Sequence, residues 1–209
     1  MIFLLYAIFI FWVLYPVLQQ SSANTFNDTH LTRRLATALL VFSGLFLIAS
    51  RLYMFVRFGE APLGYDTGFY WQYFRLAIPA GNIGTAFGSH LAYESWFPLG
   101  LIGLPPLVVI HILHIFHQIL TALALFFLLR SLPSRFSFQI SVLGVLLFAL
   151  SINQFMAFWW MFYKQLLAIP FLLLSVGLFL RRSLAAIPIA GFAAAIHLSS
   201  AVPLGAALI

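Results

Sequence analysis

The chain has 209 residues, of which 64% are hydrophobic and 7% are charged, and its mean hydropathy is +1.07. A soluble domain carries about 25% charged residues, so this composition excludes a soluble fold and predicts a surface that faces lipid. The net charge is +6, but the sequence has no run of lysine or arginine that would suggest binding to nucleic acid. The chain has no cysteine, which excludes disulfides, zinc–thiolate sites and iron–sulfur sites.

Six apolar segments follow one another along the chain, and each is near the length of about 20 residues that a helix needs to cross the hydrocarbon core. They cover 1–18, 35–56, 99–129, 136–150, 166–180 and 184–209. Because lipid cannot satisfy exposed backbone groups, we expect helices throughout. The sequence therefore predicts an all-α, polytopic transmembrane bundle of about six spans, forming a single transmembrane domain over 1–209.

Four of these segments are unusual in length or at their ends. The segment 1–18 has no basic residues at its start, which favours an uncleaved span over a signal peptide. The segments 136–150 and 166–180 are short, and aromatic flanks can lengthen both of them. The last segment is still apolar at Ile209, so we expect this domain to be the N-terminal part of a longer protein.

Basic residues predict the orientation of the spans. Arginines follow the first, third and fifth segments, at Arg33, Arg34, Arg130, Arg135, Arg181 and Arg182. The other side receives Arg51, Arg57, Arg75 and Lys164. Since cytoplasmic loops are enriched in lysine and arginine, the six-to-four bias predicts that the N-terminus and the loop 57–97 are extracytoplasmic.

The loop 57–97 holds three of the four carboxylates of the chain, Glu60, Asp66 and Glu94. Aromatic residues recur at helical spacing after Asp66, which predicts a short amphipathic helix in the headgroup layer between spans two and three. Asp66 would cap this helix, or act as a general base on an acceptor hydroxyl, or do both. Glu60 and Glu94 are either solvated loop charges or a second carboxylate and ligands for Mg²⁺ or Mn²⁺.

Two basic residues are candidates for holding a phosphate on a lipid carrier. They are Arg75, in the acidic loop, and Lys164, just before the fifth apolar segment. A guanidinium group binds phosphate in bidentate fashion, and an ammonium group binds it as a point charge. The alternative for both is that the side chain extends to the anionic headgroups of the bilayer.

Three histidines, His111, His114 and His117, form an H-x-x-H-x-x-H pattern within the third span. On a helix they cover a stripe of roughly 120°, so two of them could face a metal or a haem. His197 is the other buried candidate for such a site. The alternative is that the histidines form hydrogen bonds between helices.

The chain resembles the GT-C superfamily of membrane glycosyltransferases, which use polyprenyl-phosphate-linked sugars. Four short motifs carry this resemblance through their order along the chain. They are PLGYDTGFY at 62–70, WFPLG at 96–100, FWWMFYKQLLA at 158–168 and GFAAAIH at 191–197. The resemblance covers roughly 33–209, and the extra first span departs from the family pattern.

The resemblance implies a site and a reaction. The first-loop aspartate of the family is the catalytic base or lies at the active centre, and this role would fall on Asp66. The implied partners are a polyprenyl-phosphate-linked sugar, a glycan or protein acceptor and the lipid bilayer, in a prokaryotic plasma membrane. We therefore expect an integral, multi-pass membrane enzyme that transfers a sugar to a hydroxyl or amide.

Other interpretations stay open at this point. Polysaccharide polymerases of the EpsG/Wzy type are similar as well, with a Gly-x-Asp motif, a basic residue followed by Gln at Lys164, and a small-residue–His motif at His197. Their basic residue is usually arginine, so Lys164 departs from that pattern. From other classes, a transporter, a haem or metal protein built on the three histidines, or a membrane anchor without a site would also suit the composition.

Overall fold

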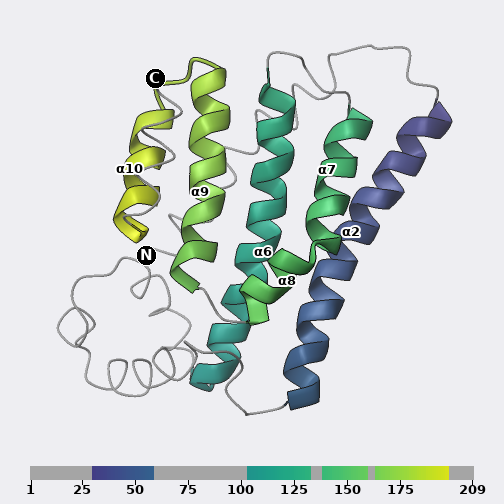
Figure 1. The fold of residues 1–209 in the computed structure, drawn as a ribbon, viewed down its shortest axis with the longest axis vertical. Coiled ribbons are helices and arrows are strands. Elements are labelled where there is room, and N and C mark those ends of the chain that lie inside the picture. The colour runs from purple at the N-terminus through teal and green to yellow at the C-terminus, as the bar shows by residue number, and fades with distance from the viewer. Residues whose placement is uncertain (1–29, 59–102, 133–137, 160–162, 198–209) are drawn as a thin grey trace.

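The computed structural model describes residues 30–58, 103–132, 138–159 and 163–197 (Figure 1). In these ranges the chain forms helices and no strand, which confirms the all-α prediction. The helices are α2 (His30–Phe58), α6 (Pro106–Ser131), α7 (Phe138–Leu150), α8 (Ile152–Trp159), α9 (Tyr163–Leu180) and α10 (Ala186–Ile196).

Two helices are long and apolar enough to cross a membrane, over Arg33–Phe58 and Leu107–Ser131. Helices α7 and α8 meet at a bend of 47° and make a third span if the pair is counted as one. The apolar stretches Leu166–Leu180 and Ala186–Ile196 are shorter. The described residues thus contain two or three membrane-spanning helices, which is fewer than the six predicted for the whole chain. The predicted first span lies outside the described residues.

Proline and the aromatic flanks explain where several helices begin. Helix α6 begins at Pro106, because Pro105 is extended (φ −56°, ψ 138°) and helical geometry is disfavoured for the residue before a proline. The start of the third apolar segment, at 99–102, lies outside the described residues. The lengthening through aromatic flanks holds for α9, which begins at Tyr163, whereas α7 ends at Leu150 and the separate helix α8 follows after Ser151.

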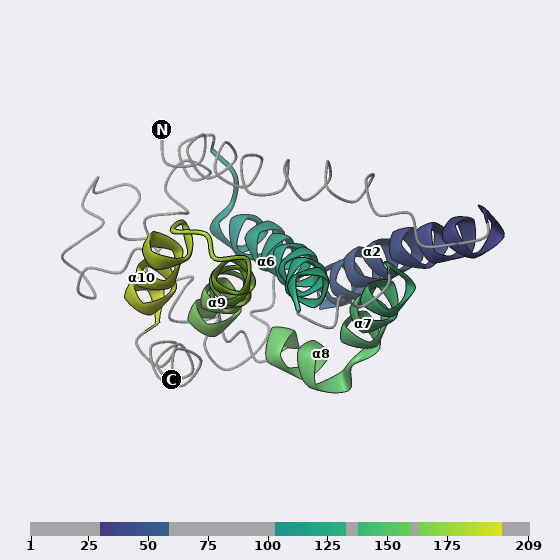
Figure 2. The same ribbon diagram turned by 90° about the horizontal axis from the view of Figure 1, so that it is seen from above.

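Helix α6 lies at the centre of the bundle. It packs against α2, α7 and α9, while α10 packs on the other side of α9. Seen from above, α10, α9, α6 and α2 lie roughly in a row, with α7 and α8 on one side of it (Figure 2). A buried apolar cluster joins α6, α9 and α10, and it includes Ile110, Phe127, Phe171 and Ile189.

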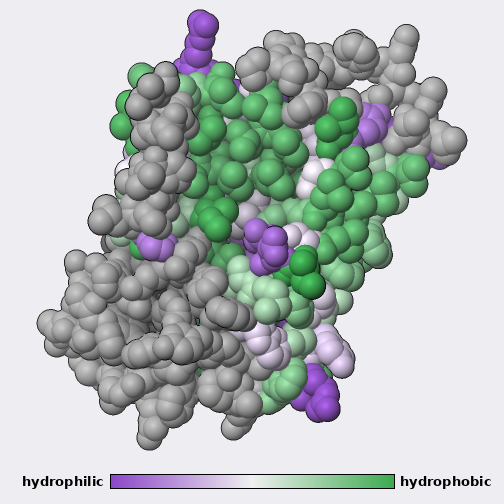
Figure 3. All heavy atoms as spheres, in the orientation of Figure 1, coloured by the Kyte–Doolittle hydropathy of each residue, from purple (hydrophilic) through white to green (hydrophobic). Residues whose placement is uncertain are grey.

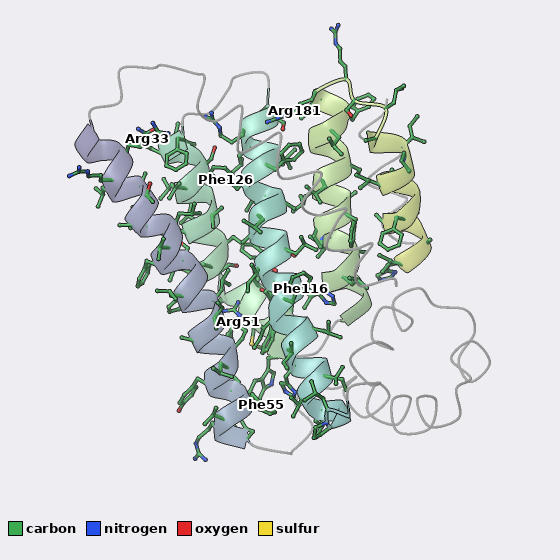
Figure 4. All side chains as sticks on the ribbon, turned by 180° about the vertical axis from the view of Figure 1, so that it is seen from behind. Arg33, Arg51, Phe55, Phe116, Phe126 and Arg181 are labelled. Carbon is green, nitrogen blue, oxygen red and sulfur yellow. The ribbon has the colours of Figure 1, made fainter. Side chains whose placement is uncertain are left out.

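The helices alternate in direction, so basic residues gather at one end of the bundle. Arg33 and Arg181 lie at the same end, near the C-terminus of α6 (Figure 4). There the Arg181 Nε–H donates a hydrogen bond to Ser131 Oγ at 2.7 Å. On the face shown in Figure 3, most of the described residues between the two ends are hydrophobic. This arrangement suits a helical membrane protein; which end faces the cytoplasm stays a prediction.

Single glycines in three apolar segments predict points of close helix packing. At Gly177 of α9, an added Cβ would meet ring atoms of Phe127 at 2.7 and 2.8 Å and the backbone of Leu128 at 3.4 Å. At Gly144 of α7 it would meet the side chain of Leu129 at 2.5 Å. At Gly44 of α2 it would meet nothing within 4 Å. The prediction is confirmed for two glycines and wrong for Gly44.

Replacing Gly177 by valine is therefore expected to lower the free energy of unfolding by about 1–3 kcal/mol, because the Phe127 ring and the α6 backbone cannot both move away. The measurement is thermal unfolding of the purified protein in a mild detergent. Gly44→Val is the matched control and should leave the midpoint nearly unchanged. Equal shifts in the two variants would contradict the close approach of α9 to α6.

Candidate functional site

Most of the predicted site residues lie outside the described residues. Asp66, Glu60, Glu94 and Arg75, together with the amphipathic helix expected after Asp66, all belong to 59–102. Their roles stay predictions. The backbone of Lys164 lies in the first turn of α9. His197 follows the last turn of α10, in an extended conformation (φ −149°, ψ 110°).

The helices that carry or flank these residues have the relevant ends at the same end of the bundle. Helix α2 ends, and α6 begins, toward the lower end of the bundle in Figure 1. The segment 59–102 therefore leaves and re-enters the described bundle at the same end. The N-terminus of α9, with Lys164, and the C-terminus of α10, with His197, point toward this end as well.

A buried arginine lies in the half of the bundle that is nearer this end. Arg51 of α2 is only 1% exposed and lies between α2 and α6 (Figure 4). Its Nη1 donates to Ser50 Oγ at 2.8 Å, and its Nη2 donates to Gln118 Oε1 of α6 at 3.5 Å, a long hydrogen bond. The rings of Phe155 and Phe158 in α8 lie 5.3 and 5.8 Å from the guanidinium carbon.

All the partners of Arg51 just named are neutral. The chain has four carboxylates, at Asp28, Glu60, Asp66 and Glu94, and none of them belongs to the described residues. The Arg51 Nε–H and the Gln118 side-chain amide nitrogen are buried and have no hydrogen-bond acceptor in the described part of the chain. A buried charge usually has a partner of opposite sign, because placing arginine at the centre of a membrane helix costs about 2.5–3.5 kcal/mol.

The three histidines of α6 are buried in the bundle. His111, His114 and His117 are 2%, 0% and 2% exposed. The His111 Nδ1 lies 2.7 Å from the carbonyl oxygen of Leu107, and the ring packs on Phe55 with 4.6 Å between centroids. Within the described residues, no three histidine, cysteine or acidic side chains could hold a metal ion together. The described residues therefore show no three-ligand metal site, and the haem interpretation stays a prediction.

His114 connects α6 to the end of α8. Its Nε2 lies 3.3 Å from the carbonyl oxygen of Phe158, and the two rings pack with 4.7 Å between centroids. The carbonyls in the last turn of a helix lack partners within that helix. His114 therefore satisfies one of them and holds α8 against α6, beside Arg51.

Replacing His114 by leucine should lower the free energy of unfolding by about 1–3 kcal/mol, because the carbonyl of Phe158 loses its donor in a dry environment. The prediction is checked by unfolding in detergent, together with limited proteolysis of the segment that follows α8. His114→Gln can still donate and serves as the comparison. If the leucine variant is as stable as the glutamine variant, the link between α6 and α8 does not matter for stability.

Arg51 was counted from the sequence only as a charge at the end of a span, so its burial was missed. The sequence of α2 contains a pattern that could have indicated the burial of Arg51. The residues that the structure buries on this helix include Ala36, Ser43, Leu47 and Arg51, at spacings of seven, four and four. Such a spacing marks one face of a helix. An arginine on the same face as small and apolar residues points into the bundle.

No family model, curated protein or solved structure matches the chain. Function must therefore be inferred from the residues themselves. The described cluster offers a fixed guanidinium group, an amide NH₂ and several aromatic faces. These groups can bind an anion, but they include no carboxylate that could serve as a base. Asp66, the predicted base, lies outside the described ranges.

Proposed function

We propose that this protein is a polytopic membrane glycosyltransferase of the GT-C type, with about six spans in all. It would move a sugar from a polyprenyl-phosphate carrier to a hydroxyl or amide of a glycan or protein acceptor, at the extracytoplasmic face. The observation that carries the proposal is Arg51, a buried cation with no carboxylate in the described part of the chain. It lies toward the end of the bundle where 59–102 is attached.

The proposed chemistry divides the work among the predicted residues. Asp66 takes the proton from the acceptor while the acceptor oxygen or nitrogen attacks the anomeric carbon. The bond to the carrier phosphate breaks on the opposite face, so the configuration inverts. Arg75 and Lys164 stabilise the negative charge on the departing phosphate. Glu60 and Glu94 are the residues that would hold Mg²⁺ or Mn²⁺ if the reaction uses a metal.

A polymerase of the EpsG/Wzy type is the second candidate. The support for it comes from Lys164 and His197, the residues of the two motifs that resemble this type of polymerase. Helix α9 starts one residue before Lys164, and α10 ends one residue before His197. The two residues of these motifs thus come at helix ends that point the same way. The product separates the candidates, because a transferase adds one sugar per acceptor and a polymerase joins whole repeat units.

The test is sugar transfer in proteoliposomes that contain the purified full chain. Polyprenyl-phosphate sugars with a radioactive label are offered together with acceptor glycans and peptides. A single labelled sugar on the acceptor supports the transferase, and a ladder of lengths from lipid-linked oligosaccharides supports the polymerase. If label stays on the carrier for every donor and acceptor, the proposed function is wrong.

A further inference from the structure

The positive charge of Arg51 needs an explanation that the described partners do not provide. A serine hydroxyl and an amide oxygen are its hydrogen-bond acceptors, and two aromatic rings lie beside it. The two cation–π contacts together contribute about 1–4 kcal/mol, which is of the same order as the cost of about 2.5–3.5 kcal/mol for an arginine at the centre of a membrane helix, but they leave the charge without a counter-ion among the described residues. An anion is the partner that would offset this cost.

Two buried donors mark where such an anion would bind. The Nε–H of Arg51 and the NH₂ of Gln118 both lack an acceptor among the described residues, although Arg51 Nη2 and Gln118 Oε1 contact each other. The donors therefore belong to adjoining side chains of α2 and α6. An oxyanion with several oxygens can accept from both of them, and the planar fork of arginine suits a phosphate in particular.

The position of Arg51 along α2 suits the phosphate group of a lipid. Arg51 comes seven residues before Phe58, where α2 ends, and this corresponds to about 10 Å along the helix axis. Next to it on α2, Leu52 and Tyr53 are 45% and 63% exposed and face outward, where a lipid chain would lie. An amphiphile could thus place its phosphate beside Arg51 while its chain stays in the hydrocarbon.

Aromatic side chains separate Arg51 from the end of the bundle. The ring of Phe55 packs on His111, and Phe58 packs edge-on against Trp159 with 5.3 Å between centroids. Phe55 and Phe58 lie on α2 beyond Arg51, toward the end of the helix, and their partners belong to α6 and α8. They shield the guanidinium group from water on that side, and electrostatic attraction to an anion is stronger where water is excluded.

We propose that Arg51 and Gln118, beneath Phe155 and Phe158, form a binding site for the phosphate group of an isoprenoid or similar single-chain amphiphile. Arg51 and Gln118 are different residues from Arg75 and Lys164, the two phosphate-binding candidates predicted from the sequence. It deepens the proposed function, since it rests on a lipid-linked phosphate being the substrate class. Binding can nevertheless be measured without sugar transfer, so failure of one does not imply failure of the other.

The experiment uses the full chain in dodecyl maltoside and measures equilibrium binding of farnesyl phosphate by titration calorimetry. Farnesol, which has the same chain and no phosphate, is expected not to bind at this site. Arg51→Gln should weaken the binding of farnesyl phosphate by roughly 10- to 100-fold, as expected for loss of charged hydrogen bonds. Arg57→Gln is the matched control, because Arg57 is exposed on the same helix, and it should keep the wild-type affinity.

The remaining arms decide between sources of the anion. If inorganic phosphate binds with the same affinity as farnesyl phosphate, Arg51 and Gln118 form an oxyanion site, but its ligand is the free ion and not a lipid. Arg51→Lys keeps a charge without the fork and should bind more weakly than wild type even if Arg51→Gln fails to fold. Wild-type affinity in the lysine variant, or no binding by the wild type, overturns the proposal. So does binding that appears only when Glu60, Asp66 and Glu94 are neutralised together, because a loop carboxylate would then be the partner of Arg51.

Discussion

Replacing Asp66 by asparagine is expected to lower sugar transfer by about 10²- to 10⁴-fold, the usual contribution of a general base. The amide has nearly the same size as the carboxylate but cannot accept a proton at neutral pH. Asparagine caps a helix about as well as aspartate does, so this change separates the two roles that the sequence allows for Asp66. Transfer is measured in proteoliposomes, and the amount of inserted protein is measured alongside.

The best control for this change is Asp28→Asn, because Asp28 is the one carboxylate of the chain outside the loop 57–97. It should leave both transfer and insertion unchanged. Asp66→Ala removes the cap as well as the base, so it should be less stable than Asp66→Asn and no more active. Full transfer activity in Asp66→Asn would leave Asp66 with a capping role only and would mean that another group takes the proton from the acceptor.

The sequence predicted the helical class correctly because lipid leaves few choices for the backbone. It also predicted two of the three close approaches, since glycine in an apolar helix has few other uses. Gly44 shows the limit of that argument, because the same residue type on α2 has nothing within 4 Å. Whether a glycine meets another helix depends on the face it occupies and on the neighbour across from it, and neither is a local property of the sequence.

Helix boundaries were less predictable for a related reason. Hydropathy does not record that Pro105 and Pro106 delay the start of α6, or that the chain bends by 47° between α7 and α8. At the bend, Ser151 Oγ accepts a hydrogen bond from the backbone of Gln154, and this bond starts a new helix in a sequence that stays apolar. A count of apolar residues therefore cannot say whether such a stretch forms one helix or two.

The buried cluster shows most clearly what a single sequence leaves out. Arg51, Gln118 and Phe158 come from three helices, and the contact between Arg51 and Gln118 joins residues 67 positions apart. The periodic pattern on α2 could have placed Arg51 on an inward face, but it could not have named its partners. The histidine pattern left two interpretations open, a metal or haem site and hydrogen bonds between helices, and the contact of His114 with the carbonyl of Phe158 in α8 is of the second kind.

If Arg51 is retained for binding rather than for stability, then Arg51→Met should not destabilise the protein. Methionine has a similar length, packs well against the rings of Phe155 and Phe158, and needs no counter-ion. Replacing a buried charge by an apolar side chain of similar volume is often neutral or stabilising. We expect the free energy of unfolding to stay the same or to rise by up to about 2 kcal/mol, while the binding of farnesyl phosphate is lost.

Arg51→Ala gives the comparison that makes this result decisive. It also removes the charge, but it leaves a cavity between α2, α6 and α8, and truncations of this size cost about 2–5 kcal/mol. The two variants are compared by reversible unfolding in mixed micelles, with and without farnesyl phosphate. A methionine variant as unstable as the alanine variant would mean that the contacts of Arg51 with Ser50, Gln118 and the two rings hold the helices together. A stable methionine variant that no longer binds would mean that the protein keeps a costly buried charge for the sake of its ligand.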